Sequence, residues 1–153
     1  MLKLSKPEYI IIHASGYGHG DAQKIRDKQI SQGYSDIGFH AIIMNGRRAM
    51  KYNKLDDGLV EMGRSEKYMG AHCKAHKMNA YSIGVCLIGH PESSRFPTKR
   101  QMASLIYYLA KKCDQYDIPV ENITQHSDWD SNHPKCANLD IEKIREKVKD
   151  IIE

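Results

Sequence analysis

The sequence lacks the features that would make a chain fibrous, repetitive or membrane-spanning. It has no internal repeat, no low-complexity tract, no long run of like charge and no apolar stretch long enough to cross a bilayer. The apolar run at residues 9–12 is too short for a signal-peptide core, and His13 rather than a cleavage site follows it. We therefore expect one globular domain over residues 1–153, without membrane insertion.

Paired cysteine spacing and a phosphate-binding loop are absent too. Without a secretory signal we expect four reduced thiols, at Cys73, Cys86, Cys113 and Cys136. The glycines of residues 16–20 (GYGHG) do not have the spacing of a dinucleotide or phosphate fingerprint. The net charge of +4 suits a polyanion such as cell wall, membrane surface or nucleic acid, and does not choose among them.

What is present is an alternation of apolar runs and capped helices. Period-two or continuous apolar runs predict strands. Asp21 and Thr98 are predicted to cap the first and second helices, and apolar stripes mark the second and the last helix. The expected strands lie at 9–13, 38–44, 59–61, 82–88 and 123–125, and the expected helices at 22–32, 98–115 and 139–152. This order predicts an α/β fold, a mixed sheet with helices on its faces.

Several local details follow from the same pattern. Asn45-Gly46 predicts a tight hairpin turn after the second strand. Alternation in that strand places Phe39 and Ala41 on one face and His40 and Ile42 on the other. The uncharged run at 82–88 is typical of a central strand. The last helix is expected to bury four residues, Ile141, Ile144, Val148 and Ile151.

The most informative stretch is residues 125–140, QHSDWDSNHPKCANLD, a polar loop between the last strand and the last helix. It contains His126 and Cys136, and imidazole with thiolate is a donor set that Zn²⁺ selects. Ten positions separate the two, so on spacing alone they could equally be a solvated imidazole and a buried thiol. His13, at the carboxyl end of the first strand, supplies the third ligand that a catalytic zinc site needs.

Several separated blocks of this chain resemble the zinc-dependent N-acetylmuramoyl-L-alanine amidases of the bacteriophage lysozyme type, relatives of the peptidoglycan recognition proteins. The blocks are IIIHAS at 10–15, DIGFHAII at 36–43, VEMGRSE at 60–66, GAHCKAHKMNAYSIGVCLIG at 70–89, and His126 with CANLD at 136–140. They cover most of the chain in the family's order.

The resemblance implies a single catalytic amidase domain over residues 1–153, without a separate wall-binding domain. It implies one Zn²⁺ on His13, His126 and Cys136, and a cleft for peptidoglycan, glycan with stem peptide, in which His72 and Asn79 match lining positions. Asn79 has an alternative role, holding its loop by local hydrogen bonds. The implied reaction is hydrolysis of the amide between N-acetylmuramic acid and L-alanine.

This chain departs from the family pattern at two auxiliary positions. Phe39 stands where the phage enzymes have a tyrosine, and Lys135 directly precedes Cys136 where the pattern has one residue between. We expect Phe39 to line the substrate site, Lys135 to stabilise the oxyanion and His133 to act as a proton shuttle. The alternatives are a solvated lysine and a histidine that only lines the loop. Trp129 either stacks on a sugar or, as we favour, anchors the loop.

The implied setting is a phage or prophage endolysin and bacteriolytic enzyme. Without a signal peptide it would accumulate in the host cytoplasm and reach the wall through a separate pore. We expect a monomer that does not bind nucleic acid. Two other functions stay open: a non-catalytic peptidoglycan-binding module, which retention of Cys136 argues against, and a regulatory protein that binds phage RNA polymerase.

Overall fold

The computed structural model describes all residues, 1–153, as a five-stranded sheet with helices on both faces. The strand order is β3-β2-β4-β1-β5, and the single antiparallel pair, β2 with β3, makes the sheet mixed. The strands are β1 (Tyr9–Ala14), β2 (Ala41–Asn45), β3 (Asp57–Met62), β4 (Ser82–Leu87) and β5 (Ile123–Gln125). The α/β fold predicted from the sequence is confirmed.

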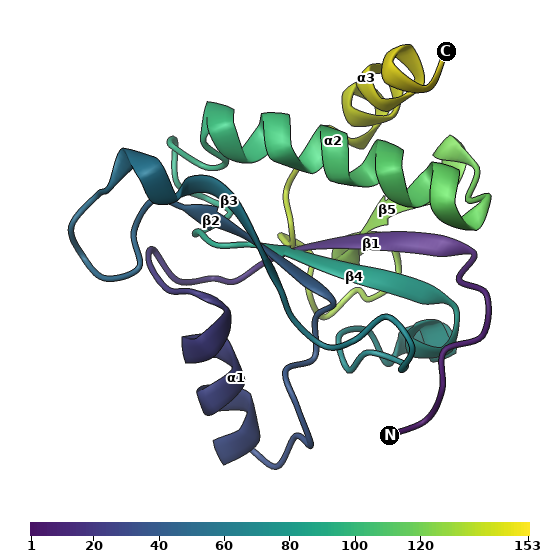
Figure 1. Cartoon of the computed structure of the whole chain (residues 1–153), viewed down its shortest axis with the longest axis horizontal. Helices are drawn as coiled ribbons and strands as arrows, with labels where there is room; N and C mark the ends of the chain where they lie inside the picture. The colour runs from purple at the N-terminus through teal and green to yellow at the C-terminus, as the bar shows by residue number, and fades with distance from the viewer.

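Three α-helices cover this sheet, and Figure 1 shows α2 and α3 on one face and α1 on the other. Their bounds are α1 (Ala22–Ser31), α2 (Lys99–Tyr116) and α3 (Ile141–Ile152). Four short 3₁₀ turns complete the chain: η1 (Lys54–Asp56), η2 (Ala75–Ala80), η3 (Val120–Asn122) and η4 (His126–Asp128). None of these helices is long and apolar enough to cross a membrane.

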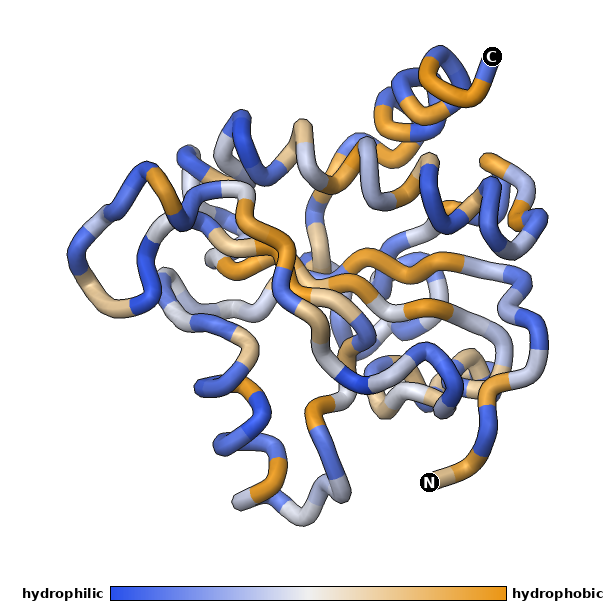
Figure 2. Tube along the Cα trace, viewed as in Figure 1, coloured by the Kyte–Doolittle hydropathy of each residue, from blue (hydrophilic) through white to orange (hydrophobic).

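The main core lies between the sheet and α2 and α3. Ile10 and Ile12 of β1 point into it, together with one face of α2, and both isoleucines are fully buried. Ile11 and His13 point to the opposite face, because side chains alternate along a strand. In Figure 2 the apolar stretches gather on the central strands. Every residue of β4 is buried, as expected for a central strand.

The predicted caps of the helices are confirmed. The Asp21 side chain accepts a hydrogen bond from the Lys24 backbone N–H and so caps the amino terminus of α1. Thr98 and Gln101 form a reciprocal capping box at the start of α2. The cap of α3 is Asp140, so this helix begins two residues later than Leu139, where the sequence placed it.

Three local expectations about strands and burial are wrong. Asn45 does pair across the hairpin with Asp57, but residues 46–56 form a long loop instead of a tight turn. The Tyr52 ring packs so closely on Gly46 that a Cβ there would lie 2.5 Å from Tyr52 Cε1. Glycine at residue 46 therefore leaves room for the Tyr52 ring inside this loop.

The second strand begins at Ala41 instead of Gly38, so strand alternation does not extend back to residue 39. Phe39 consequently packs against the cluster that contains Ile42, not on the face of Ala41. Ile151 is 50% exposed because the last turn of α3 projects away from the sheet (Figure 1). The other three predicted α3 core residues are buried.

Candidate metal centre and active site

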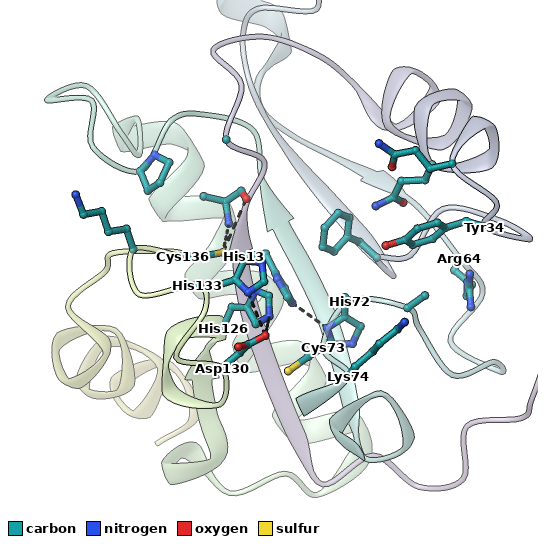
Figure 3. Close-up of a pocket in the computed structure, with 18 of the residues that line it drawn as sticks. His13, Tyr34, Arg64, His72, Cys73, Lys74, His126, Asp130, His133 and Cys136 are labelled. Carbon is teal, nitrogen blue, oxygen red and sulfur yellow. Dashed lines mark hydrogen bonds and ion pairs between the residues drawn. The ribbon is translucent and has the colours of Figure 1, made fainter. Parts of the chain in front are cut away.

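The three predicted metal ligands meet at one edge of the sheet. His13 lies near the end of β1 and His126 directly follows β5, and these two strands are parallel neighbours. Their carboxyl ends therefore reach the same edge. One ligand atom each of His13, His126 and Cys136 lies within 4.8 Å of the others. The cluster next to β1 is visible in Figure 3.

The loop that carries Cys136 is held in place by hydrogen bonds at both ends. The Ser127 backbone N–H donates to the Cys136 carbonyl at 2.6 Å, and Gln125 makes hydrogen bonds to both backbone groups of Leu139. Trp129 Nε1 donates to Thr124 Oγ1 at 2.8 Å, and its ring meets Tyr9 edge-on. Trp129 does not line the cavity described below, so it anchors the loop, as favoured from the sequence.

Burial sets the protonation state of the two histidines in the cluster. It lowers the pKa of His13 well below the usual histidine value, with further lowering from the charges of the neighbouring histidines. Burial likewise lowers the pKa of His126. Both rings are therefore neutral at neutral pH, the form in which imidazole binds a metal.

Burial raises the pKa of the Cys136 thiol in the metal-free protein. The Ala14 backbone N–H donates to Cys136 Sγ at 3.3 Å, which would stabilise a thiolate once a cation offsets the burial. Two neutral imidazoles and one sulfur on a cavity wall fit a catalytic zinc, which takes three protein ligands and keeps a fourth position open.

His72 lies directly behind His13. Its Nδ1 is 2.8 Å from His13 Nε2, and its Nε2 is 3.3 Å from Ser82 Oγ. Burial, reinforced by the charges of His40 and His126, lowers the pKa of His72 to about 3, so this ring too is neutral at neutral pH. His72 also lines the cavity, as expected.

Asn79 is not among the residues that line the cavity. Its Oδ1 accepts hydrogen bonds from the backbone N–H groups of His72 at 2.9 Å and Cys73 at 2.8 Å. This is the loop-holding role that was the alternative for Asn79. His40 has a structural role: it is fully buried and hydrogen-bonded through both ring nitrogens, to the Gly84 backbone N–H and the Tyr68 carbonyl.

Asp130 is a site residue that the sequence reasoning missed. Its carboxylate lies 3.1 Å from His133 Nδ1 and 3.7 Å from His126 Nε2. The His133 ring stacks on His126 with centroids 4.3 Å apart. These three residues form a second group that could hold a metal. The three-residue spacing of Asp130 and His133 was the available signal.

The two side chains at which this chain departs from the family pattern, Phe39 and Lys135, both line the cavity. Phe39 lines the cavity, and its ring centroid is 5.1 Å from that of His13. Lys135 also lines the cavity, but its side chain is largely exposed and its ammonium pairs with Glu92. The position of Lys135 does not test its assigned role in stabilising the oxyanion, and this role stays a prediction.

The ligands open into a cavity of about 940 Å³. His133 and Lys135 line it together with the ligand cluster, and so do five residues for which the sequence predicted no role: Gln29, Gln32, Tyr34, Arg64 and Lys74. Figure 3 shows Tyr34 and Arg64 across the cavity from Cys136. Arg64 is buried, and its guanidinium donates to the carbonyls of Asp36, Ile37 and Met69.

The mixed sheet and its helices make this chain a single-domain α/β protein. Its two-histidine, one-cysteine cluster opens into a wide cavity, and such a site is suited to metal-assisted hydrolysis. Sequence comparison then identifies the family. A family model described as N-acetylmuramoyl-L-alanine amidase matches residues 3–137, and the chain belongs to this family. The family predicted from the sequence is confirmed.

Individual relatives agree with this assignment. The endolysin of Enterobacteria phage T3 is 32% identical over 148 residues, which cover 92% of this chain and 86% of the phage protein. The solved N-acetylmuramoyl-L-alanine amidase LysC of Clostridium intestinale superposes with a TM-score of 0.78 at 26% identity, over 94% of this chain and 86% of LysC. A mutant of Drosophila PGRP-LB in complex with tracheal cytotoxin superposes with a TM-score of 0.67 at 25% identity, over 88% of this chain and 77% of that one.

Proposed function

We propose that this protein is a zinc-dependent phage-type endolysin that hydrolyses the amide between N-acetylmuramic acid and L-alanine in peptidoglycan. The observation that carries the proposal is the convergence of His13, His126 and Cys136 within 4.8 Å at the wall of the 940 Å³ cavity. A cluster of this composition in a family of amidases supports catalysis over a purely wall-binding role.

The relatives support the setting of this activity. Their names describe endolysins of phages, and one solved neighbour is bound to tracheal cytotoxin. We infer that residues 1–153 form one catalytic domain, which acts on the cell wall as a monomer after release through a separate pore. The partner is peptidoglycan, its glycan and stem peptide together filling the cavity.

The chain's own residues would bind and orient the scissile amide beside the metal. A zinc ion held by the three ligands would polarise the scissile carbonyl and lower the pKa of its bound water to about 7. Phe39 would form an apolar wall next to His13 and limit access of bulk water. His72 would support His13 from behind.

Two side chains would act on charge and protons during the reaction. Lys135, on the loop directly before Cys136, would stabilise negative charge on the carbonyl oxygen after exchanging its Glu92 partner for substrate. Asp130 contacts the His133 ring, which stacks on His126, and from this place on the cavity wall His133 would pass a proton to the leaving nitrogen. Removing an oxyanion donor typically costs about two to three orders of magnitude in rate.

Digestion of purified peptidoglycan with and without a zinc chelator tests the proposal. We expect new L-alanine amino termini without new reducing ends, and we expect chelation to abolish their release and added zinc to restore it. New reducing ends would instead indicate cleavage of the glycan. Co-sedimentation with the wall without any cleavage would support the binding-module function and overturn the amidase.

A further inference from the structure

A chain of hydrogen bonds runs from a backbone carbonyl to the metal ligand His13. Ser82 Oγ lies 2.7 Å from the Met78 carbonyl oxygen and 3.3 Å from His72 Nε2. His72 Nδ1 lies 2.8 Å from His13 Nε2. Ser82, His72 and His13 are all buried, so water does not compete for these bonds.

Only one arrangement of protons satisfies every bond in this chain. A carbonyl oxygen cannot donate, so the single hydroxyl proton of Ser82 goes to Met78. Ser82 Oγ can then only accept, which places a proton on His72 Nε2. A neutral imidazole carries one proton, so His72 Nδ1 must accept, and the donor is His13 Nε2. The nitrogen of His13 with a free lone pair is therefore Nδ1.

The backbone around His72 is shaped to keep its ring in this chain. A Cβ on Gly84 would lie 2.6 Å from His72 Cγ, and one on Gly70 would lie 2.5 Å from His72 Cδ2. Glycine at both positions lets the ring lie flat on β4, within reach of Ser82. The His40 ring holds the Gly84 backbone N–H through its Nδ1, which fixes the strand beneath His72.

We propose that Ser82 is a positioning residue for the metal centre, which acts through His72 to fix the tautomer of His13 so that Nδ1 is its metal-binding nitrogen. The inference rests on the proposed zinc site but concerns the protein before zinc binds. Residues behind a metal-binding histidine commonly set its tautomer, and their loss typically costs about 10- to 100-fold in metal affinity.

Long-range ¹H–¹⁵N correlation spectra of the histidine rings in the metal-free protein test the tautomers directly. We expect His13 and His72 both to carry their proton on Nε2, with their signals assigned from single His→Gln variants. A proton on Nδ1 of His13 would overturn the proposal. This readout needs neither zinc nor activity, so it is separate from any failure of the proposed amidase function.

Zinc affinity, measured by competition with a chromogenic chelator, tests the contribution of Ser82. Ser82→Ala should weaken zinc binding about 10- to 100-fold and leave His13 in a mixture of tautomers. Ser82→Thr keeps the hydroxyl and should restore the zinc affinity and the single tautomer of His13. The matched control is Ser104→Ala, which removes a serine-to-carbonyl bond on α2 remote from the site and should leave zinc affinity unchanged. Unchanged zinc affinity in a folded Ser82→Ala protein would overturn the proposal.

Discussion

At the scale of single residues, Phe39 is the position at which the family resemblance led us to expect a tyrosine. Its ring lines the cavity and lies 5.1 Å from the His13 ring, between centroids, without a hydroxyl to donate. We expect Phe39→Tyr to raise kcat with little change in KM, because a new donor near the scissile carbonyl acts mainly on the transition state. Steady-state kinetics on soluble muropeptides measure this. An unchanged kcat would show that another group already supplies the donor.

Cys136 is the residue on which the metal assignment depends most. We expect Cys136→Ser to abolish zinc retention and activity together, because three protein ligands leave no redundancy. Zinc content after dialysis and amidase assays measure the two effects. Cys113→Ala, which changes a buried thiol on the core-facing side of α2, is the control and should retain zinc. Full activity in the Cys136→Ser protein would disprove the metal site.

At the scale of elements, an ion pair between Glu66 and Lys112 connects the segment after β3 to α2. Glu66 accepts hydrogen bonds from Lys112 Nζ at 2.9 Å and from the Tyr116 hydroxyl at 2.6 Å. Burial raises the pKa of Glu66, but these hydrogen bonds and the charge of Lys112 outweigh burial, so its pKa lies below the usual value. The same segment contains Arg64, so this attachment also supports the far end of the cavity.

The Glu66 contact predicts a pH-dependent stability. A carboxyl whose pKa is lower in the folded state stabilises above its unfolded pKa, about 4.3, and loses this contribution as the pH falls through the folded pKa. Glu66→Gln should lower the free energy of unfolding by about 1–3 kcal/mol at neutral pH, and the difference from wild type should shrink in acid. Urea unfolding of both proteins over a pH series measures this difference in the free energy of unfolding.

The control for this series is Glu142→Gln, which removes an ion pair with Arg145 on α3 whose carboxylate is mostly exposed. Exposed pairs contribute about 0–1 kcal/mol, so this variant should follow the wild-type curve. A Glu66→Gln protein as stable as wild type at neutral pH would show that the attachment to α2 depends on packing alone.

At the scale of the whole molecule, the metal would link segments that are far apart in the chain. Residue 13 belongs to the first strand, whereas residues 126 and 136 flank the loop before the last helix. Zinc that binds only the folded chain should stabilise it by about 2.7 kcal/mol when free zinc is 100 times Kd. We expect zinc to raise Tm and a chelator to lower it, measured by scanning calorimetry. Cys136→Ser should abolish the rise of Tm with zinc. A wild-type Tm that does not change with zinc would argue against a metal site in the folded protein.

The sequence by itself determined most of the elements and predicted the three candidate ligands. Apolar runs identified the five strands, and Asp21 and Thr98 correctly marked the starts of two helices, because these signals act within a few residues along the chain. His13, His126 and Cys136 were predicted as ligands from their imidazole and thiol donors and from the family resemblance, and the structure brings one ligand atom of each within 4.8 Å of the others.

Only the tertiary structure decided how those residues are supported. Asp130 beside His133, and Ser82 behind His72 and His13, are contacts between side chains that local periodicity does not specify. The packing of the Tyr52 ring on Gly46 is another contact of this kind. Such contacts depend on sheet order and on the loop before β4. Pairing β1 with β5 brings His13 close to His126, whereas Ser82 pairs with Tyr9 on β1 and reaches His13 only through the ring of His72. Local sequence patterns specify the elements, and the spatial order of the strands decides which side chains meet.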